Sequence, residues 1–187
     1  LISGLDLEAV WLAKHNVRGA LIPPQACISR VAKPRIEGFE RLPKVTVPPW
    51  ISLPADPEIL HEFARANDWS LWVKGPAYGA RRVKNWRTTE KAIDDLGKTW
   101  GSGGLFLQAD VPGKEVSIAF CAYKGTLLDV VFMEKRSVTD EGKTWSGVIH
   151  EPDQELALAL RGAIDELDWT GGGELEFVRD ESGRLWL

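Results

Sequence analysis

The sequence of 187 residues predicts an α+β protein with mainly antiparallel sheets, because helix and strand patterns are mixed along it. Residues 115–123 place strongly apolar side chains at every second position, which is typical of a strand with one buried face. Residues 152–167 instead repeat apolar side chains every 3.6 positions, which indicates the longest helix. Short turns such as Lys124-Gly125 separate neighbouring strands, so we expect these strands to pair as hairpins.

The composition excludes several classes of protein. Hydrophobic residues make up 44% of the chain and charged residues 27%, which favours a folded core over a disordered chain. The net charge of −4 offers no basic surface for nucleic acid. No apolar stretch is long enough to span a membrane, no signal peptide is evident, and Cys27 and Cys121 form no disulfide framework. We therefore expect a cytoplasmic protein that binds neither nucleic acid nor membrane; its oligomeric state stays open.

The first elements follow from helix caps and prolines. Residues 4–16 carry a helical apolar face. Seven prolines within residues 17–55 favour a connector with one short helix near residues 34–42. Asp56-Pro57-Glu58 combines a capping carboxylate with a proline at the first helical position, which predicts a helix that ends at Asn67.

The remaining elements are short. We expect a helix over residues 89–96 that stops at Gly97. Residues 137–149 are polar and contain a tryptophan, which favours an exposed loop, and Gly171-Gly172-Gly173 is expected to break the chain. Further strands are expected, in chain order, at residues 71–74, 80–83, 105–109, 127–132 and 174–179 and from Arg184.

Familiar short motifs are not matched. Gly-Lys-Thr occurs twice, but Ala92 and Ser137 stand where a phosphate-binding P-loop needs a glycine. The three histidines lack zinc-site spacing. The nine tryptophans could form a sugar-binding surface, although the position of Trp72 within an apolar strand favours core packing for part of them.

Basic residues end two of the predicted strands. Lys74 ends an apolar strand and faces a loop of small residues, where an ammonium and backbone N–H groups can bind a phosphate. A lysine whose stem lies along the sheet edge is the alternative interpretation. Lys135 and Arg136 end a later strand.

Acidic residues lie on two of the predicted strands. Glu115 begins a strand, and the alternation of the segment after Gly173 puts Glu174 and Glu176 on one face of another. A carboxylate on an inward strand face near a basic group suits magnesium and phosphate, whereas a solvated strand face is the alternative.

Taken in order and spacing, segments across residues 30–187 resemble the ATP-grasp superfamily. Trp-Val-Lys-Gly-Pro at 72–76 is similar to the strand that ends in a phosphate-binding lysine. Leu-Gln-Ala-Asp-Val-Pro-Gly-Lys-Glu at 107–115 resembles the adenine hinge and ribose glutamate. Glu-Leu-Glu-Phe at 174–177 resembles the metal-binding hairpin. The resemblance implies two α+β subdomains that clasp a nucleotide.

Residue roles follow from this resemblance alone. It implies magnesium binding by Glu176 and places Lys135 and Arg136 as catalytic cations for the γ-phosphate or an acyl phosphate. The second pair of metal ligands, a Glu-x-Asn, would begin just past Leu187. The implied nucleotide-binding residues are the phosphate lysines Lys33 and Lys74, the hinge residues Gln108, Ala109 and Val111, and the ribose acceptor Glu115.

The resemblance also implies a domain organisation. The expected parts are a remnant of a preceding substrate domain at 1–28, a helical connector at 29–69, a small lid subdomain at 70–107, and a C-terminal subdomain at 108–187 that is truncated before the final metal-ligand motif.

The implied activity is that of an ATP- and Mg²⁺-dependent ligase. Such an enzyme activates a small carboxylate as an acyl phosphate, which an amine or other nucleophile attacks. Two alternatives remain: a nucleotide-binding module without catalysis, either a pseudoenzyme or an inactive fragment, and a tryptophan-rich carbohydrate-binding protein.

Overall fold

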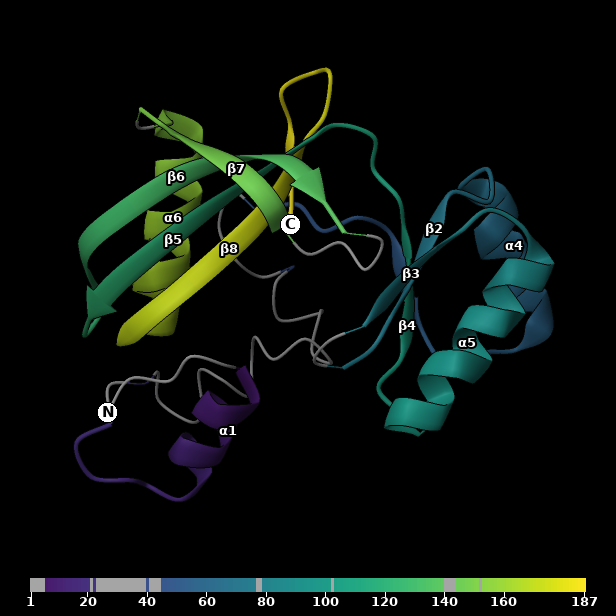
Figure 1. Ribbon diagram of the computed structural model, residues 1–187, viewed down its shortest axis with the longest axis horizontal. Coiled ribbons are helices and arrows are strands. Elements are labelled where there is room, and N and C mark those ends of the chain that lie inside the picture. The colour runs from purple at the N-terminus through teal and green to yellow at the C-terminus, as the bar shows by residue number, and fades with distance from the viewer. Residues whose placement is uncertain are drawn as a thin grey trace. The chain divides into compact units, whose positions relative to one another are not determined.

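The computed structural model divides the chain into two compact units, which are described separately (Figure 1). The structure describes residues 6–20, 22, 40, 45–76, 79–101, 103–139, 144–151 and 153–187. The first unit comprises Leu1–Val47, Pro112–Ser137 and Thr144–Leu187, and the second comprises Pro48–Val111 and Val138–Lys143. Apart from Glu40, the short helix predicted near 34–42 lies outside the described residues, and the predicted domain bounds stay predictions.

The second unit holds a four-stranded sheet in the order β1-β4-β2-β3, in which each strand is antiparallel to its neighbours. Its strands are β1 (Trp50–Ser52), β2 (Leu71–Lys74), β3 (Ala80–Val83) and β4 (Phe106–Ala109), and its helices are α4 (Pro57–Ala66) and α5 (Trp86–Trp100). The predicted strands 71–74 and 80–83 are confirmed without a shift of bounds.

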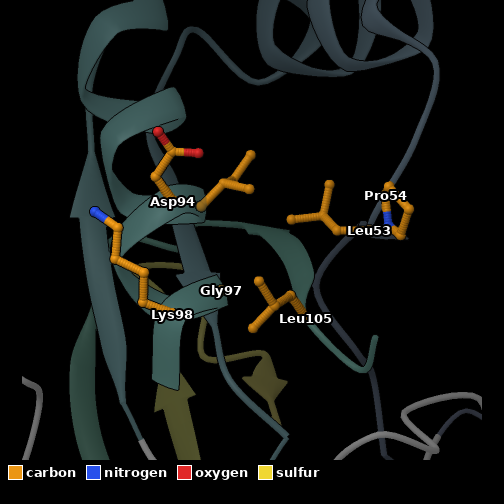
Figure 2. A pocket seen from close by; sticks show the side chains of 7 residues that line it. Leu53, Pro54, Asp94, Gly97, Lys98 and Leu105 are labelled. Carbon is orange, nitrogen blue, oxygen red and sulfur yellow. The ribbon is translucent and has the colours of Figure 1, made fainter. Parts of the chain in front are cut away.

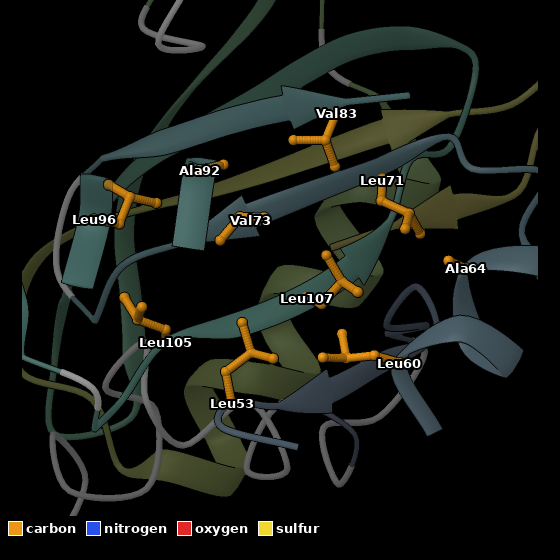
Figure 3. Close-up of a cluster of buried hydrophobic side chains, with 10 residues drawn as sticks. All are labelled: Leu53, Leu60, Ala64, Leu71, Val73, Val83, Ala92, Leu96, Leu105 and Leu107. Atoms are coloured by element: carbon orange, nitrogen blue, oxygen red, sulfur yellow. The ribbon is translucent and has the colours of Figure 1, made fainter. Parts of the chain in front are cut away.

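The core of this unit lies between the sheet and its two helices (Figure 3). Leu71 and Val73 of β2 and Leu107 of β4 are fully buried. Leu71 and Val73 are two residues apart on β2, and Leu107 is paired with Val73 on the neighbouring strand. Leu60 of α4 and Leu96 of α5 pack against them. The opposite face of β2 and β4 therefore carries Lys74 and Gln108.

Helix caps explain where the two helices begin. Asp56 accepts a hydrogen bond from the N–H of Glu58 at 2.8 Å, which confirms the predicted start of α4. Helix α5 starts earlier than expected, because Asn85 and Thr88 form a capping box. The predicted stop at Gly97 is wrong: the helix continues to Trp100 and ends at Gly101, whose φ is +77°. One glycine inside a helix costs only about 1 kcal/mol, and Trp100 packs on the core.

The first unit holds a five-stranded sheet in the order β7-β6-β5-β8-β9. Its strands are β5 (Lys114–Tyr123), β6 (Thr126–Val138), β7 (Thr144–His150), β8 (Gly171–Arg179) and β9 (Leu185–Trp186), with helices α1 (Asp6–Lys14) and α6 (Gln154–Leu167). Strand β5 is antiparallel to both β6 and β8.

Two expectations for this unit are wrong. Residues 144–150 form strand β7 rather than a loop, and β6 extends to Val138. Every residue of β7 is exposed, and a solvated edge strand does not need the apolar alternation that identifies buried strands. The glycines at 171–173 belong to β8 rather than breaking the chain. A Cβ on Gly173 would lie 2.5 Å from the ring of Phe120, so this glycine makes room for an aromatic neighbour.

The two faces of the five-stranded sheet differ in character. Val116 and Ile118 of β5 and Phe177 of β8 form a core with α6, as the alternation predicts. The opposite face carries Glu115 and, across the strands, Glu176. Among the described residues, no helix combines the length and the apolar character that a membrane span requires.

Candidate functional site

Lys135 lies at the centre of a charged cluster on the face of the five-stranded sheet opposite α6. Its Nζ lies 3.4 Å from Oε2 of Glu115 on β5 and donates a hydrogen bond to Oε1 of Glu176 on β8. The Lys135 side chain is only 4% exposed, whereas that of Glu176 is 60% exposed. Because β5 lies between β6 and β8, the Lys135 side chain crosses over β5 to reach Glu176.

The two carboxylates keep this lysine charged. Burial of the Lys135 side chain acts against the ammonium form, but the hydrogen bond to Glu176 and the charges of Glu176 and Glu115 outweigh it and raise the pKa of Lys135. The charged ammonium of Lys135 therefore lies between the side chains of two glutamates.

Ser117 is a third member of this face, which the sequence reasoning missed. It lies across from Glu176 on β8 and from Met133 on β6. Its side chain is 1% exposed, and its hydroxyl has no hydrogen-bond partner among the residues that the structure describes. A serine on the more polar side of an alternating strand is common, so the sequence offered no signal for it.

Arg136 is not brought into this cluster. Its Nε lies 3.4 Å from Oε1 of Glu134, two residues away on the same strand. Since successive residues of a strand point to opposite faces, Arg136 and Lys135 lie on opposite sides of β6.

Lys74 and Gln108 form a polar pair in the second unit. The Nζ of Lys74 donates to Oε1 of Gln108 at 2.6 Å, and Gln108 is buried. An ammonium only donates hydrogen bonds, so this contact fixes the amide oxygen of Gln108. Lys74 is half-buried and is the last residue of β2. Directly after it, the N–H of Gly75 donates a hydrogen bond to the carbonyl of Gly79 at 2.8 Å.

Asp110 anchors the chain directly after β4. Its carboxylate accepts hydrogen bonds from Ser70 Oγ and from Trp72 Nε1, both at 2.8 Å, and from Arg82. Burial alone would raise the pKa of Asp110, but these donors outweigh burial and lower it. The sequence places Asp110 within the predicted hinge segment and indicates no role for it; in the structure, its three donors fix the chain directly after β4.

The other predicted hinge residues, Ala109 and Val111, also lie in the second unit. Ala109 is buried, and its N–H donates to the carbonyl of Pro49 at 2.8 Å. Val111 is half-buried at the end of the unit. Lys33 lies outside the described residues. The structure thus brings Lys74 to Gln108 in one unit, and Lys135 to its two glutamates in the other.

Two further features bear on possible sites. Among the described residues, no three His, Cys, Asp or Glu side chains gather as a metal site. A cavity of about 460 Å³ opens on the second unit and contains none of the predicted site residues (Figure 2). Its lining is mainly aliphatic, with one acid and one base: Leu53, Pro54, Ile93, Asp94, Gly97, Lys98 and Leu105.

Comparison with known proteins identifies the fold. No family model matches the sequence, and no curated protein matches it either. Among solved structures, the biotin carboxylase domain of Hydrogenobacter thermophilus 2-oxoglutarate carboxylase, solved with MgADP and bicarbonate, has a TM-score of 0.73 at 20% identity over 95% of this chain and 43% of its own. Biotin carboxylase of Campylobacter jejuni gives 0.74 at 17% identity over 97% and 44%.

A second kind of enzyme shares the architecture. The D-alanine-D-alanine ligase of Coxiella burnetii has a TM-score of 0.72 at 15% identity, over 98% of this chain and 53% of its own. The chain therefore spans about half the length of these three proteins. The two antiparallel sheets and their helices, matched over nearly the whole chain, show that it has the ATP-grasp fold.

Proposed function

We propose that this chain forms part of an ATP- and Mg²⁺-dependent ligase that activates a carboxylate as an acyl phosphate for attack by an amine or another nucleophile. The observation that carries the proposal is the cluster of Lys135 with Glu115 and Glu176, a lysine and two partly exposed carboxylates on one sheet face. The fold supports it, because the similar solved proteins are a carboxylase bound to MgADP and a D-alanine-D-alanine ligase.

The residues of this cluster fit a magnesium ion. Magnesium usually keeps several waters and binds through one or two carboxylates together with substrate phosphates, rather than in a closed cage of protein ligands. Glu176 offers an exposed carboxylate of this kind. When bound, the ion would neutralise and orient phosphate oxygens.

The proposed roles of the other residues follow the chemistry of their side chains. Lys74 would hold phosphate oxygens, since it is a cation at a strand end beside a loop of small residues. Gln108, Ala109 and Val111 would contact the adenine, and Glu115 would accept a hydrogen bond from the ribose. Lys33 is proposed as a second phosphate lysine, on the resemblance alone.

In the proposed reaction, bonds form and break within the substrates, and these residues position them and stabilise their charge. A bond forms between the γ-phosphorus and a carboxylate oxygen of the substrate, and the bond from this phosphorus to the β,γ-bridging oxygen breaks. The nucleophile then forms a bond to the acyl carbon, and phosphate leaves. Because charge accumulates on phosphate oxygens throughout, positioned cations such as Lys135 and Lys74 supply the catalysis. We propose no general base, and the role of Arg136 as a second cation stays a prediction.

The test is nucleotide binding followed by turnover. Calorimetry with MgATP should show binding to the wild-type protein and at least about tenfold weaker binding to Lys74→Ala, since a phosphate–lysine contact contributes more than 1.4 kcal/mol. Lys91→Ala removes an exposed lysine of α5 in the same unit and is the matched control. Equal affinity of the two variants would exclude Lys74 from the nucleotide site.

Turnover distinguishes a ligase from a binding module. An ADP-release screen of the full-length protein across amino acids and small carboxylates should give substrate-dependent ADP. Binding without ADP release would instead identify a non-catalytic nucleotide-binding protein.

The carbohydrate-binding alternative gains no support from the tryptophans of the second unit. The indole N–H of Trp72 is occupied by Asp110. Trp69, Trp86 and Trp100 pack against the core of the unit. Quenching of tryptophan fluorescence by sugars but not by MgATP would contradict the ligase proposal.

A further inference from the structure

The Lys135 side chain links three strands of the five-stranded sheet. It starts on β6, crosses β5 and ends at Glu176 on β8, on the face that also bears Ser117. The ammonium of Lys135 lies beside Glu115 and Glu176, and Glu176 is opposite Ser117 in the register. Ser117 is buried, although the carboxylate opposite it is exposed.

One polar group on this sheet face has no hydrogen-bond partner among the described residues. A buried hydroxyl without a partner is unfavourable, because it has lost its hydrogen bonds to water. The Ser117 hydroxyl has no partner among the described residues while Lys135 is bonded to Glu176.

The same contact opposes a metal ion at Glu176. A carboxylate that accepts a hydrogen bond from an ammonium has much of its charge neutralised, and a divalent cation beside that ammonium meets an unfavourable charge. Both carboxylates are open to solvent while the lysine is not, so a ligand can reach the pair from the solvent side. A phosphate can compete for the ammonium, since charge-assisted hydrogen bonds to phosphate are as strong as those to carboxylate.

We propose that Lys135 exchanges partners when the site fills. In the empty site its ammonium neutralises Glu115 and Glu176; a phosphate-bearing ligand takes the ammonium, which frees Glu176 for a divalent cation. Metal binding at Glu176 is then coupled to phosphate binding, and metal binds more weakly in the absence of phosphate. This inference rests on the proposed function, since it takes a nucleotide as the phosphate-bearing ligand, and coupling of this kind is reciprocal.

The experiment measures Mn²⁺ affinity by electron paramagnetic resonance, with and without a non-hydrolysable ATP analogue. Lys135→Met keeps the length of the stem and removes the charge, and Lys114→Met removes a charge from an exposed lysine next to Glu115 as the matched control. Lys135→Gln is the second variant, to be used if Lys135→Met unfolds. Circular dichroism checks the fold of each.

We expect that removal of the Lys135 charge raises Mn²⁺ affinity and makes it depend less on nucleotide. Without nucleotide, Lys135→Met should bind Mn²⁺ at least about fivefold more tightly than wild type, and Lys114→Met should match wild type. The analogue should raise Mn²⁺ affinity strongly in wild type and much less in Lys135→Met. Adding Glu176→Gln to Lys135→Met should abolish the gain.

Two results would overturn the proposal. One is equal Mn²⁺ affinity of Lys135→Met and Lys114→Met without nucleotide; the other is a gain that survives Glu176→Gln. If wild type binds no analogue at all, the proposed function fails, whatever the metal titrations show. If the analogue binds normally and the Lys135 variants do not change metal affinity, only the exchange of partners fails.

Discussion

Gly113 and Arg179 approach each other so closely that a Cβ on Gly113 would overlap the carbonyl oxygen of Arg179. Gly113 lies directly before β5, and Arg179 ends β8 opposite Lys114, so the chain enters the sheet past the backbone of the neighbouring strand. A backbone atom cannot rotate aside as the tip of a side chain can. The entry of β5, and with it the position of Glu115, therefore depends on a glycine.

Gly113→Ala should destabilise the protein by about 1–3 kcal/mol, the usual cost of overpacking. Chemical unfolding followed by circular dichroism measures the change. Gly97→Ala is the contrasting variant: a Cβ there meets nothing within 4 Å and the backbone is helical, so this variant should be more stable than wild type by about 0.5–1 kcal/mol. Equal effects of the two substitutions would contradict the steric argument.

Asp180 should make stability depend on acid pH. Its carboxylate accepts hydrogen bonds from Ser182, from Trp186 and from the N–H of Arg184, which lower its pKa to about 2 from 3.8. The folded pKa lies below the unfolded one, so the contribution is fully present above about pH 4 and is lost as the pH falls towards 2.

The measurement is denaturant unfolding between pH 5 and pH 2, monitored by tryptophan fluorescence. Asp180→Asn should lose stability at pH 5 and show a shallower decline with acid than wild type. Glu181→Gln, on the same turn and exposed, should decline as wild type does. A decline in Asp180→Asn as steep as in wild type would show that the turn does not titrate as described.

Trp72→Phe should weaken the second unit by removing a hydrogen bond to a charged group. The indole N–H of Trp72 donates to Asp110 at 2.8 Å, and such bonds contribute about 1.5–3 kcal/mol. Unfolding in guanidinium chloride measures the loss. Trp145→Phe is the matched control, since Trp145 is 80% exposed on β7 and should give wild-type stability. If both variants match wild type, Asp110 does not depend on this donor.

Ser117→Ala should leave stability unchanged or raise it by up to about 1 kcal/mol. The hydroxyl makes no hydrogen bond among the described residues, so its removal deletes a buried polar group and no interaction. Thr89→Ala is the comparison, because the equally buried Thr89 hydroxyl donates to the carbonyl of Asn85 at 2.9 Å, and its loss should cost about 1 kcal/mol. Thermal unfolding distinguishes them; a clear loss in Ser117→Ala would mean that its hydroxyl has a partner.

Local patterns predicted most elements because each rests on a physical signal within a few residues. Asp56 caps α4 as its spacing to Glu58 indicates, and the alternation after Glu115 gives the buried face of β5. The errors arose where the local signal was misleading. Gly97 looks like a helix stop but is tolerated inside α5, and the exposed edge strand β7 has the composition of a loop.

In the candidate site, too, local sequence patterns predict some features, and others depend on contacts between distant residues. The residues of the charged cluster were selected by resemblance, in segments that the sequence separates widely; Lys135 and Glu176 stand 41 positions apart. Their ion pair needs the strand order β6-β5-β8 and a register that puts Glu176 opposite Ser117. Arg136, adjacent to Lys135 in sequence, points to the other face.

The sequence by itself determined the α+β class, the caps, the turns and the faces of single strands, because these depend on interactions between near neighbours. Only the tertiary structure decided which side chains meet: that Lys135 crosses β5 to two glutamates, that Ser117 is buried on the same sheet face, and that Asp110 accepts hydrogen bonds from three donors. A strand's register and its neighbours are set by the packing of the whole sheet. A shift of one residue would turn each of these groups to the opposite face.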